Sequence, residues 1–143
     1  MYSFLLSLHS GLRWVVLVAL VVSVVWSFMG WFGKKPFTGA GKGLRLGTMI
    51  STHIQFLTGL ILYTISPIIK SFLSGFPETM GDKALRFYGM EHSVMMLLAV
   101  VVITIGSVKA KKKTDDLGKY KTMAIWFLVG LVFILAGMPW DRF

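Results

Sequence analysis

The stretch ALRFYGMEHSVMMLLAVVVITIGSV, residues 84–108, decides the fold of this chain. It is long enough to cross a bilayer as a helix, because about 20 predominantly apolar residues span the hydrocarbon core. Near its start it carries two adjacent ionisable residues, Glu91 and His92. Ionisable side chains are costly at membrane depth, so they mark candidate functional positions whose partners must come from other segments.

Three more apolar stretches lie on either side of this one. The chain has 143 residues, of which 55% are hydrophobic, and its mean hydropathy is +0.73. Long apolar runs between short polar loops are typical of a polytopic helical membrane protein. The sequence therefore predicts an all-α fold with one domain, residues 1–143, forming a four-helix up-and-down transmembrane bundle. The expected helices cover about residues 3–31, 44–66, 84–108 and 122–138.

The net charge of +9 is concentrated in two loops. Residues 33–45 and 109–121 hold most of the Lys and Arg, whereas the charges of residues 67–83 nearly balance. The positive-inside rule places the two basic loops in the cytoplasm and both termini in the periplasm of a bacterial inner membrane. Anionic lipid headgroups account for this charge, so nucleic-acid binding is not expected. The segment IIKSFLSGF, residues 68–76, is amphipathic and is expected to lie along the interface.

The chain contains no cysteine. This excludes disulfides, thiolate chemistry, iron–sulfur ligation and covalent c-type haem attachment. Any metal must then be bound by His, carboxylate, Met or backbone groups. The candidate iron ligands are His9, His53 and His92, with Met95 and Met96 as alternates.

A b-type haem held by two histidines is the preferred hypothesis, with one haem per chain. Helical rise places His9, His92 and His53 roughly 7–10, 12 and 16 Å below the outer edge of the membrane core, so His92 can pair with either of the others. The preferred pair is His53 with His92, and His9 is the competing ligand. Arg13 shares a helical face with His9 and is the expected partner of the haem propionates. Glu91 is expected to form a buried ion pair with Arg13.

Several segments resemble a known family over essentially the whole chain. These segments are LHSGLRW at 8–14, GKKPFTG at 33–39, HIQFLTGLILY at 53–63, LRFYGMEHSVMM at 85–96 and MPW at 138–140. They are similar to small four-helix membrane proteins of Bacteroidota, often labelled cytochrome b-like. His9, Arg13, His53, Glu91 and His92 match polar positions associated with that family. The resemblance implies a haem protein of the membrane.

Two other classes of function remain open at this point. One is a non-haem centre of Cu, Zn or Fe, which would need three donors from the histidines, Glu91 and the nearby methionines to converge. The other is a non-enzymatic accessory subunit, or a proton path along the same polar residues. No nucleotide motif or nucleophile–base pair indicates a stand-alone catalyst. The expected function is electron transfer by haem b between the quinone pool and a partner protein, with homo-oligomer or complex-subunit assembly both open.

Overall fold

The computed structural model describes residues 2–139, and every regular element in that range is helical. Trp140, which belongs to one of the resembling segments, lies outside the described residues. Along the chain the elements are α1 (Tyr2–Phe32), α2 (Gly39–Ile65), α3 (Pro67–Ser74), η1 (Glu78–Gly81), α4 (Lys83–Arg86), η2 (Phe87–Glu91), α5 (His92–Lys112) and α6 (Asp116–Ala136).

Four helical segments are long and apolar enough to cross a membrane. They are α1, α2, α6 and the continuous run α4–η2–α5, which extends from residue 83 to 112. This confirms the predicted all-α four-span bundle and makes the chain a multi-pass membrane protein. The short helix α3 lies between the second and third spans and overlaps most of the segment expected to lie along the interface.

The helices extend further into the basic loops than the sequence predicted. Helix α2 begins at Gly39 rather than near residue 44, and α6 begins at Asp116 rather than near 122. The Asp115 side chain accepts a hydrogen bond from the Gly118 amide and so caps α6. Hydropathy marks the part of a helix that lies in lipid, whereas caps and turns decide where the helix itself ends.

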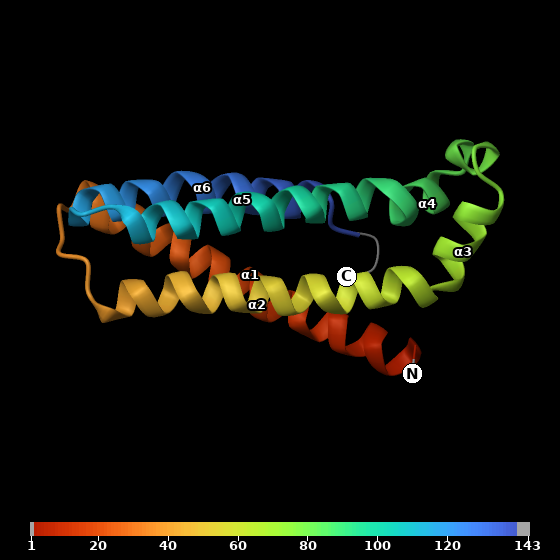
Figure 1. The fold of residues 1–143 in the computed structure, drawn as a ribbon, viewed down its shortest axis with the longest axis horizontal. Coiled ribbons are helices and arrows are strands. Elements are labelled where there is room, and N and C mark those ends of the chain that lie inside the picture. The colour runs from red at the N-terminus through yellow and green to blue at the C-terminus, as the bar shows by residue number, and fades with distance from the viewer. Residues whose placement is uncertain (1, 140–143) are drawn as a thin grey trace.

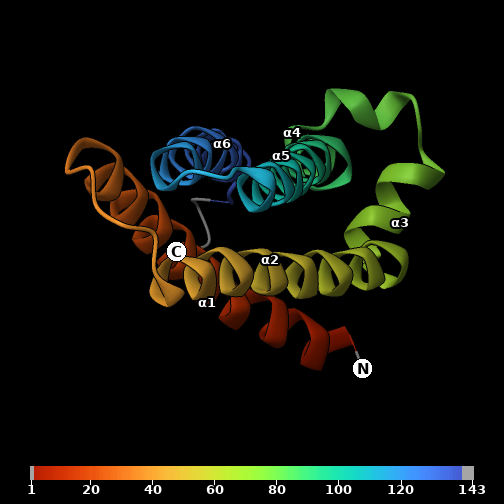
Figure 2. The ribbon, with the colours of Figure 1, turned by 60° about the vertical axis from the view of Figure 1, so that its left-hand side comes forward.

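The four long helices run up and down, and their arrangement leaves one seam more open than the others. Helix α1 crosses behind α2 at an angle and also packs against α6, which in turn packs along α5 (Figures 1 and 2). Helices α2 and α5 also touch, but their interface is smaller than those of α1 with α2, α1 with α6 and α5 with α6. A cavity lined by residues of all four long helical segments lies inside this bundle.

The core is sealed by large apolar side chains and by glycines that allow close approach. Leu20, Ile103, Met123 and Phe127 are all fully buried. A Cβ atom at Gly106 of α5 would collide with Trp126 of α6. Small residues at such crossings let membrane helices pack closely, which matters because lipid provides no hydrophobic drive for association.

We expect Gly106→Ala to destabilise the bundle by about 1–3 kcal/mol, because the new methyl group must displace a bulky indole in a packed interface. Gly47→Ala is the matched control, since no atom lies within 4 Å of the Cβ that it would add. That change should be neutral or slightly stabilising, because Ala favours a helix more than Gly does. Unfolding of the purified protein in mixed detergent micelles measures both effects. Equal midpoints for the two variants would contradict the assigned packing.

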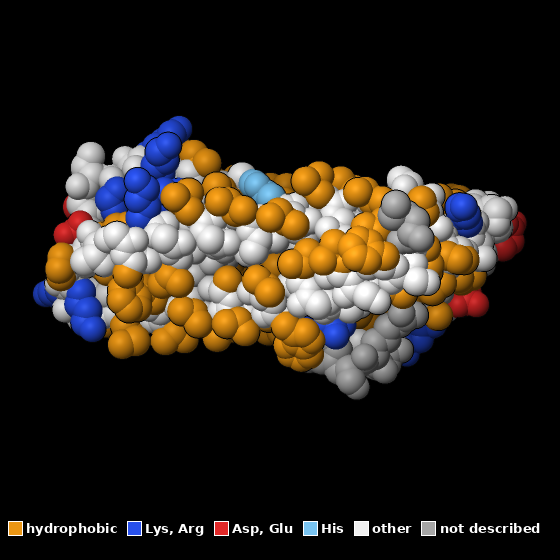
Figure 3. Space-filling view, turned by 90° about the horizontal axis from the view of Figure 1, so that it is seen from below, with side chains coloured by type: hydrophobic (Ala, Val, Ile, Leu, Met, Phe, Trp, Pro, Cys, Tyr) orange, Lys and Arg blue, Asp and Glu red, His pale blue; other side chains and the backbone are white. Residues whose placement is uncertain are grey.

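The surface agrees with a membrane position. Figure 3 shows hydrophobic side chains over the middle of one face, with Lys, Arg, Asp and Glu gathered towards the two ends. Apolar residues of all four long helices are exposed at the surface of the bundle, where they suit contact with lipid, among them Val18, Leu57, Val101 and Val132.

Candidate functional site

A cavity of about 400 Å³ lies inside the bundle near the end that carries α3. Its walls are mainly apolar and come from α1, α2, α3, η2, α5 and the end of α6. A few polar side chains converge on it: His9, Arg13, Gln55, Tyr88 and His92. An apolar cavity with a small number of polar groups is the usual form of a small-molecule site.

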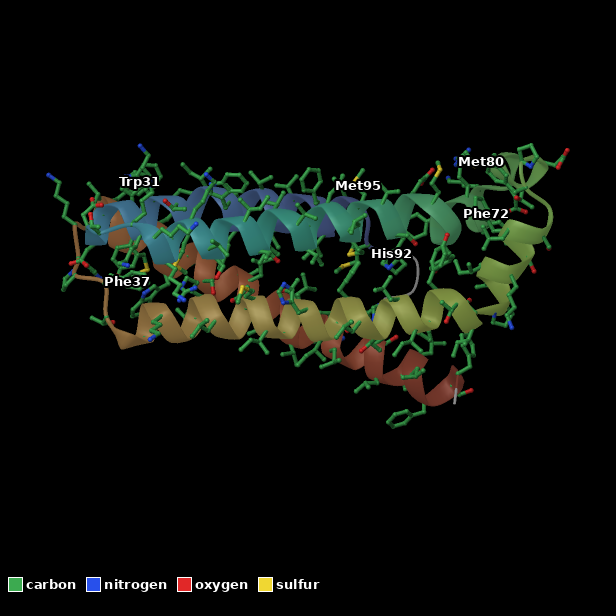
Figure 4. All side chains as sticks on the ribbon, viewed as in Figure 1. Trp31, Phe37, Phe72, Met80, His92 and Met95 are labelled. Carbon is green, nitrogen blue, oxygen red and sulfur yellow. The ribbon has the colours of Figure 1, made fainter. Side chains whose placement is uncertain are left out.

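A π-helical turn brings His92 into the cavity wall. The turn spans Phe87–Glu91, immediately before His92. It is tied to α2 by the Tyr63 hydroxyl, which donates to the Gly89 carbonyl at 2.8 Å. A π turn holds an extra residue, so it rotates the side chains that follow it, and such turns are frequent at functional sites. In Figure 4 the His92 side chain points from α5 towards α2.

A hydrogen bond between His92 and Gly137 determines which ring nitrogen of His92 carries a proton. Its Nδ1 atom lies 2.6 Å from the carbonyl oxygen of Gly137. A carbonyl oxygen can only accept, so Nδ1 carries the proton and donates it. A neutral ring then leaves Nε2 with a free lone pair, which is the arrangement found in most metal-ligating histidines.

His9 lies beside His92 in the cavity wall. The two ring centres are 6.5 Å apart, and the ring planes are nearly perpendicular at 87°. Gln55 holds the helix that carries His9, because its amide nitrogen donates to the His9 carbonyl at 2.7 Å. Within the part of the chain that the structure describes, the His9 Nδ1 and Gln55 Oε1 atoms are buried without a hydrogen-bond partner. Gly59 of α2 leaves room for the ring, since a Cβ there would lie 3.2 Å from His9 Cε1.

His53 is elsewhere in the bundle, which corrects the predicted pairing. Its Nε2 atom lies 2.7 Å from the Thr104 hydroxyl of α5, and it does not line the cavity. Thr104 follows His92 by twelve residues on one helix, a rise of about 18 Å. His53 and His92 therefore cannot ligate the same atom. The competing candidate, His9, is the residue that the structure brings to His92.

Glu91 also has a different partner from the one expected. Its carboxylate forms an ion pair with Arg86 at 2.7 Å, on a partly exposed surface. The hypothesis of a buried Arg13–Glu91 pair is therefore wrong for this structure. The π turn explains the difference, because it turns Glu91 away from the cavity while His92 enters it. Arg13 does line the cavity, and its guanidinium also lies 5.3 Å from the centre of the Trp14 ring.

The alternate methionine ligands separate. Met96 lines the cavity, whereas Met95 packs where α5 meets the end of α6, against the position of Gly137. Gln55 and Tyr88 were not among the predicted site residues, although both line the cavity. The sequence signal for Gln55 was its amide group within an apolar span, because such a group needs a partner inside the protein.

Within residues 2–139, no group of three His, Cys, Asp or Glu side chains is arranged to hold a metal ion. The three histidines do not converge, so the geometry does not favour the hypothesis of a bare ion held by three donors. Comparison of the chain with protein-family models, curated proteins and solved structures gives no match.

Proposed function

We propose that this membrane protein binds one haem b in its cavity, with His9 and His92 as the axial ligands, and transfers electrons. The observation that carries the proposal is the separation of 6.5 Å between the two imidazole centres, both of which line the cavity. Metal–imidazole bonds are about 2 Å long, so two rings that bind one metal from opposite sides have centres about 6 Å apart.

The other residues of the cavity fit the same group. The Gly137 carbonyl orients His92 so that Nε2 is available as a ligand. The apolar walls suit a porphyrin and exclude water, and Arg13 supplies a guanidinium for a carboxylate. When bound, haem b supplies a one-electron couple whose potential depends on its axial ligands and on the polarity of the pocket. The quinone pool and a partner protein are the proposed electron donor and acceptor.

The distribution of charge supports a proposed orientation. The connections between α1 and α2 and between α5 and α6 lie at one end of the bundle (Figure 1), and lysines gather in these connections and in the helix turns beside them. We place this end in the cytoplasm of a bacterial inner membrane, in accordance with the positive-inside rule. The cavity, which lies near the opposite end, is then close to the periplasmic surface.

The deciding experiment is a visible spectrum of the full chain, purified after expression with added haem precursor. The dithionite-reduced minus oxidised difference should show the sharp α and Soret bands of a six-coordinate b haem, at one haem per chain. Two neutral imidazole ligands give this low-spin signature. A flat spectrum from folded protein that has been supplied with haem would overturn the proposal.

A further inference from the structure

Two of the hydrogen bonds that join α2 to the continuous run η2–α5 leave a window between them. The Tyr63–Gly89 hydrogen bond joins α2 to η2 at the end near α3, and the His53–Thr104 hydrogen bond joins α2 to α5 deeper in the bundle. Tyr63 and His53 are ten residues apart on α2, so the ties are about 15 Å apart along this helix. No hydrogen bond is found between α2 and α5 in this interval among the described residues.

Two side chains in this interval line the cavity and are also exposed at the surface of the bundle. Leu60 of α2 and Leu97 of α5 both line the cavity, and each is 48% exposed. They therefore form the rim, with one face towards the interior and one towards the outside. Both helices are membrane spans, so the outside at this level is the acyl-chain region of the lipid rather than water.

The interior behind the rim has groups suited to a polar head. The Nδ1 atom of His9 and the Oε1 atom of Gln55 are buried polar atoms in the cavity wall, where a bound group could hydrogen-bond them. Arg13 adds a positive charge to the same wall. The site is therefore complementary to an amphiphile with a flat apolar body and an acidic or hydrogen-bonding head.

We infer that the cavity takes its ligand sideways from the bilayer, through the window between Leu60 and Leu97. The ligand class is a membrane-dissolved amphiphile. Its identification as haem b rests on the proposed function, but the route of entry does not. Entry from the periplasmic water past α3 is the competing route, and the experiment must separate the two.

The chain has no cysteine, so Met96→Cys places a single thiol on the cavity wall. In liposomes this thiol should react with a lipid-soluble maleimide faster than with a charged, membrane-impermeant one. Leu60→Trp with Leu97→Trp should slow the lipid-soluble reaction about tenfold, because two large indoles fill the rim. Ile61→Trp with Leu98→Trp is the matched control: both residues are exposed on the same helices but do not line the cavity.

The inference is overturned if the impermeant reagent reacts faster, or if the rim and control variants are labelled at the same rate. If the rim variant does not fold, Leu60→Phe with Leu97→Phe provides the same comparison with smaller rings. Loading with haemin dissolved in the liposomes then tests the two proposals separately. If the tryptophans at Leu60 and Leu97 slow labelling but no haem spectrum appears, lateral entry is supported and haem binding is overturned. If a haem spectrum appears but the rim and control variants are labelled at the same rate, haem binding is supported and lateral entry is overturned.

Discussion

Replacing His92 with alanine is expected to abolish the six-coordinate b-haem spectrum, and replacing His9 should do the same. His53→Ala should leave the spectrum unchanged. The reason is geometric: the rings of His9 and His92 line the same cavity with centres 6.5 Å apart, whereas His53 lies outside it and contacts Thr104. Removal of either axial ligand leaves at most a five-coordinate, high-spin centre, so the loss of the low-spin bands should be complete.

Three measurements make this prediction specific. Reduced-minus-oxidised spectra of the purified variants report the haem content and the coordination. Low-spin electron paramagnetic resonance of the oxidised protein reports whether both axial ligands are present. Added imidazole should restore the six-coordinate bands in His9→Ala or His92→Ala, because the cavity left by the side chain can hold the free base. If His53→Ala loses the bands and His9→Ala keeps them, the ligand pair assigned here is wrong.

The transmembrane architecture could be predicted because the bilayer sets it. An apolar segment must form a helix that satisfies its own backbone, so hydropathy alone locates each span. Residues 84–108 fall inside the observed third span, which ends at Lys112. The amphipathic segment IIKSFLSGF likewise contains most of α3. The helix ends could not be predicted in this way, since Gly39 and Asp116 lie in polar sequence where no lipid constraint applies.

The components of the site could be identified, but their pairing could not. His9, Arg13 and His92 do line one cavity, as polar residues in apolar spans were expected to do. The choice between His9 and His53 depends on how α1 crosses α2 and on the rotation that the π turn adds before His92. A depth scale of 1.5 Å per residue contains neither quantity. Histidines at similar calculated depth can therefore belong to different parts of the bundle.

Arg45 shows the same limit at the opposite end of the molecule. In the sequence it is one of the basic loop residues that set topology. In the structure it lies on α2 and is only 5% exposed. Its Nη1 atom donates to the Ser107 hydroxyl at 2.9 Å and to the Ser107 carbonyl at 3.3 Å. It is therefore a structural link between α2 and α5, at the end where the basic loops meet.

Ser107→Ala is accordingly expected to destabilise the folded bundle by about 1.5–3 kcal/mol, because a hydrogen bond to a charged group is lost while the guanidinium stays buried. The same change should cost less than about 1 kcal/mol in an Arg45→Met background, where no buried charge remains to be satisfied. Lys42→Met controls for the loss of a cation, since Lys42 is exposed on the same helix and should be near neutral. The double-mutant cycle is measured by unfolding in mixed micelles. Equal costs of Ser107→Ala in both backgrounds would show that the Arg45–Ser107 contact does not hold these helices together.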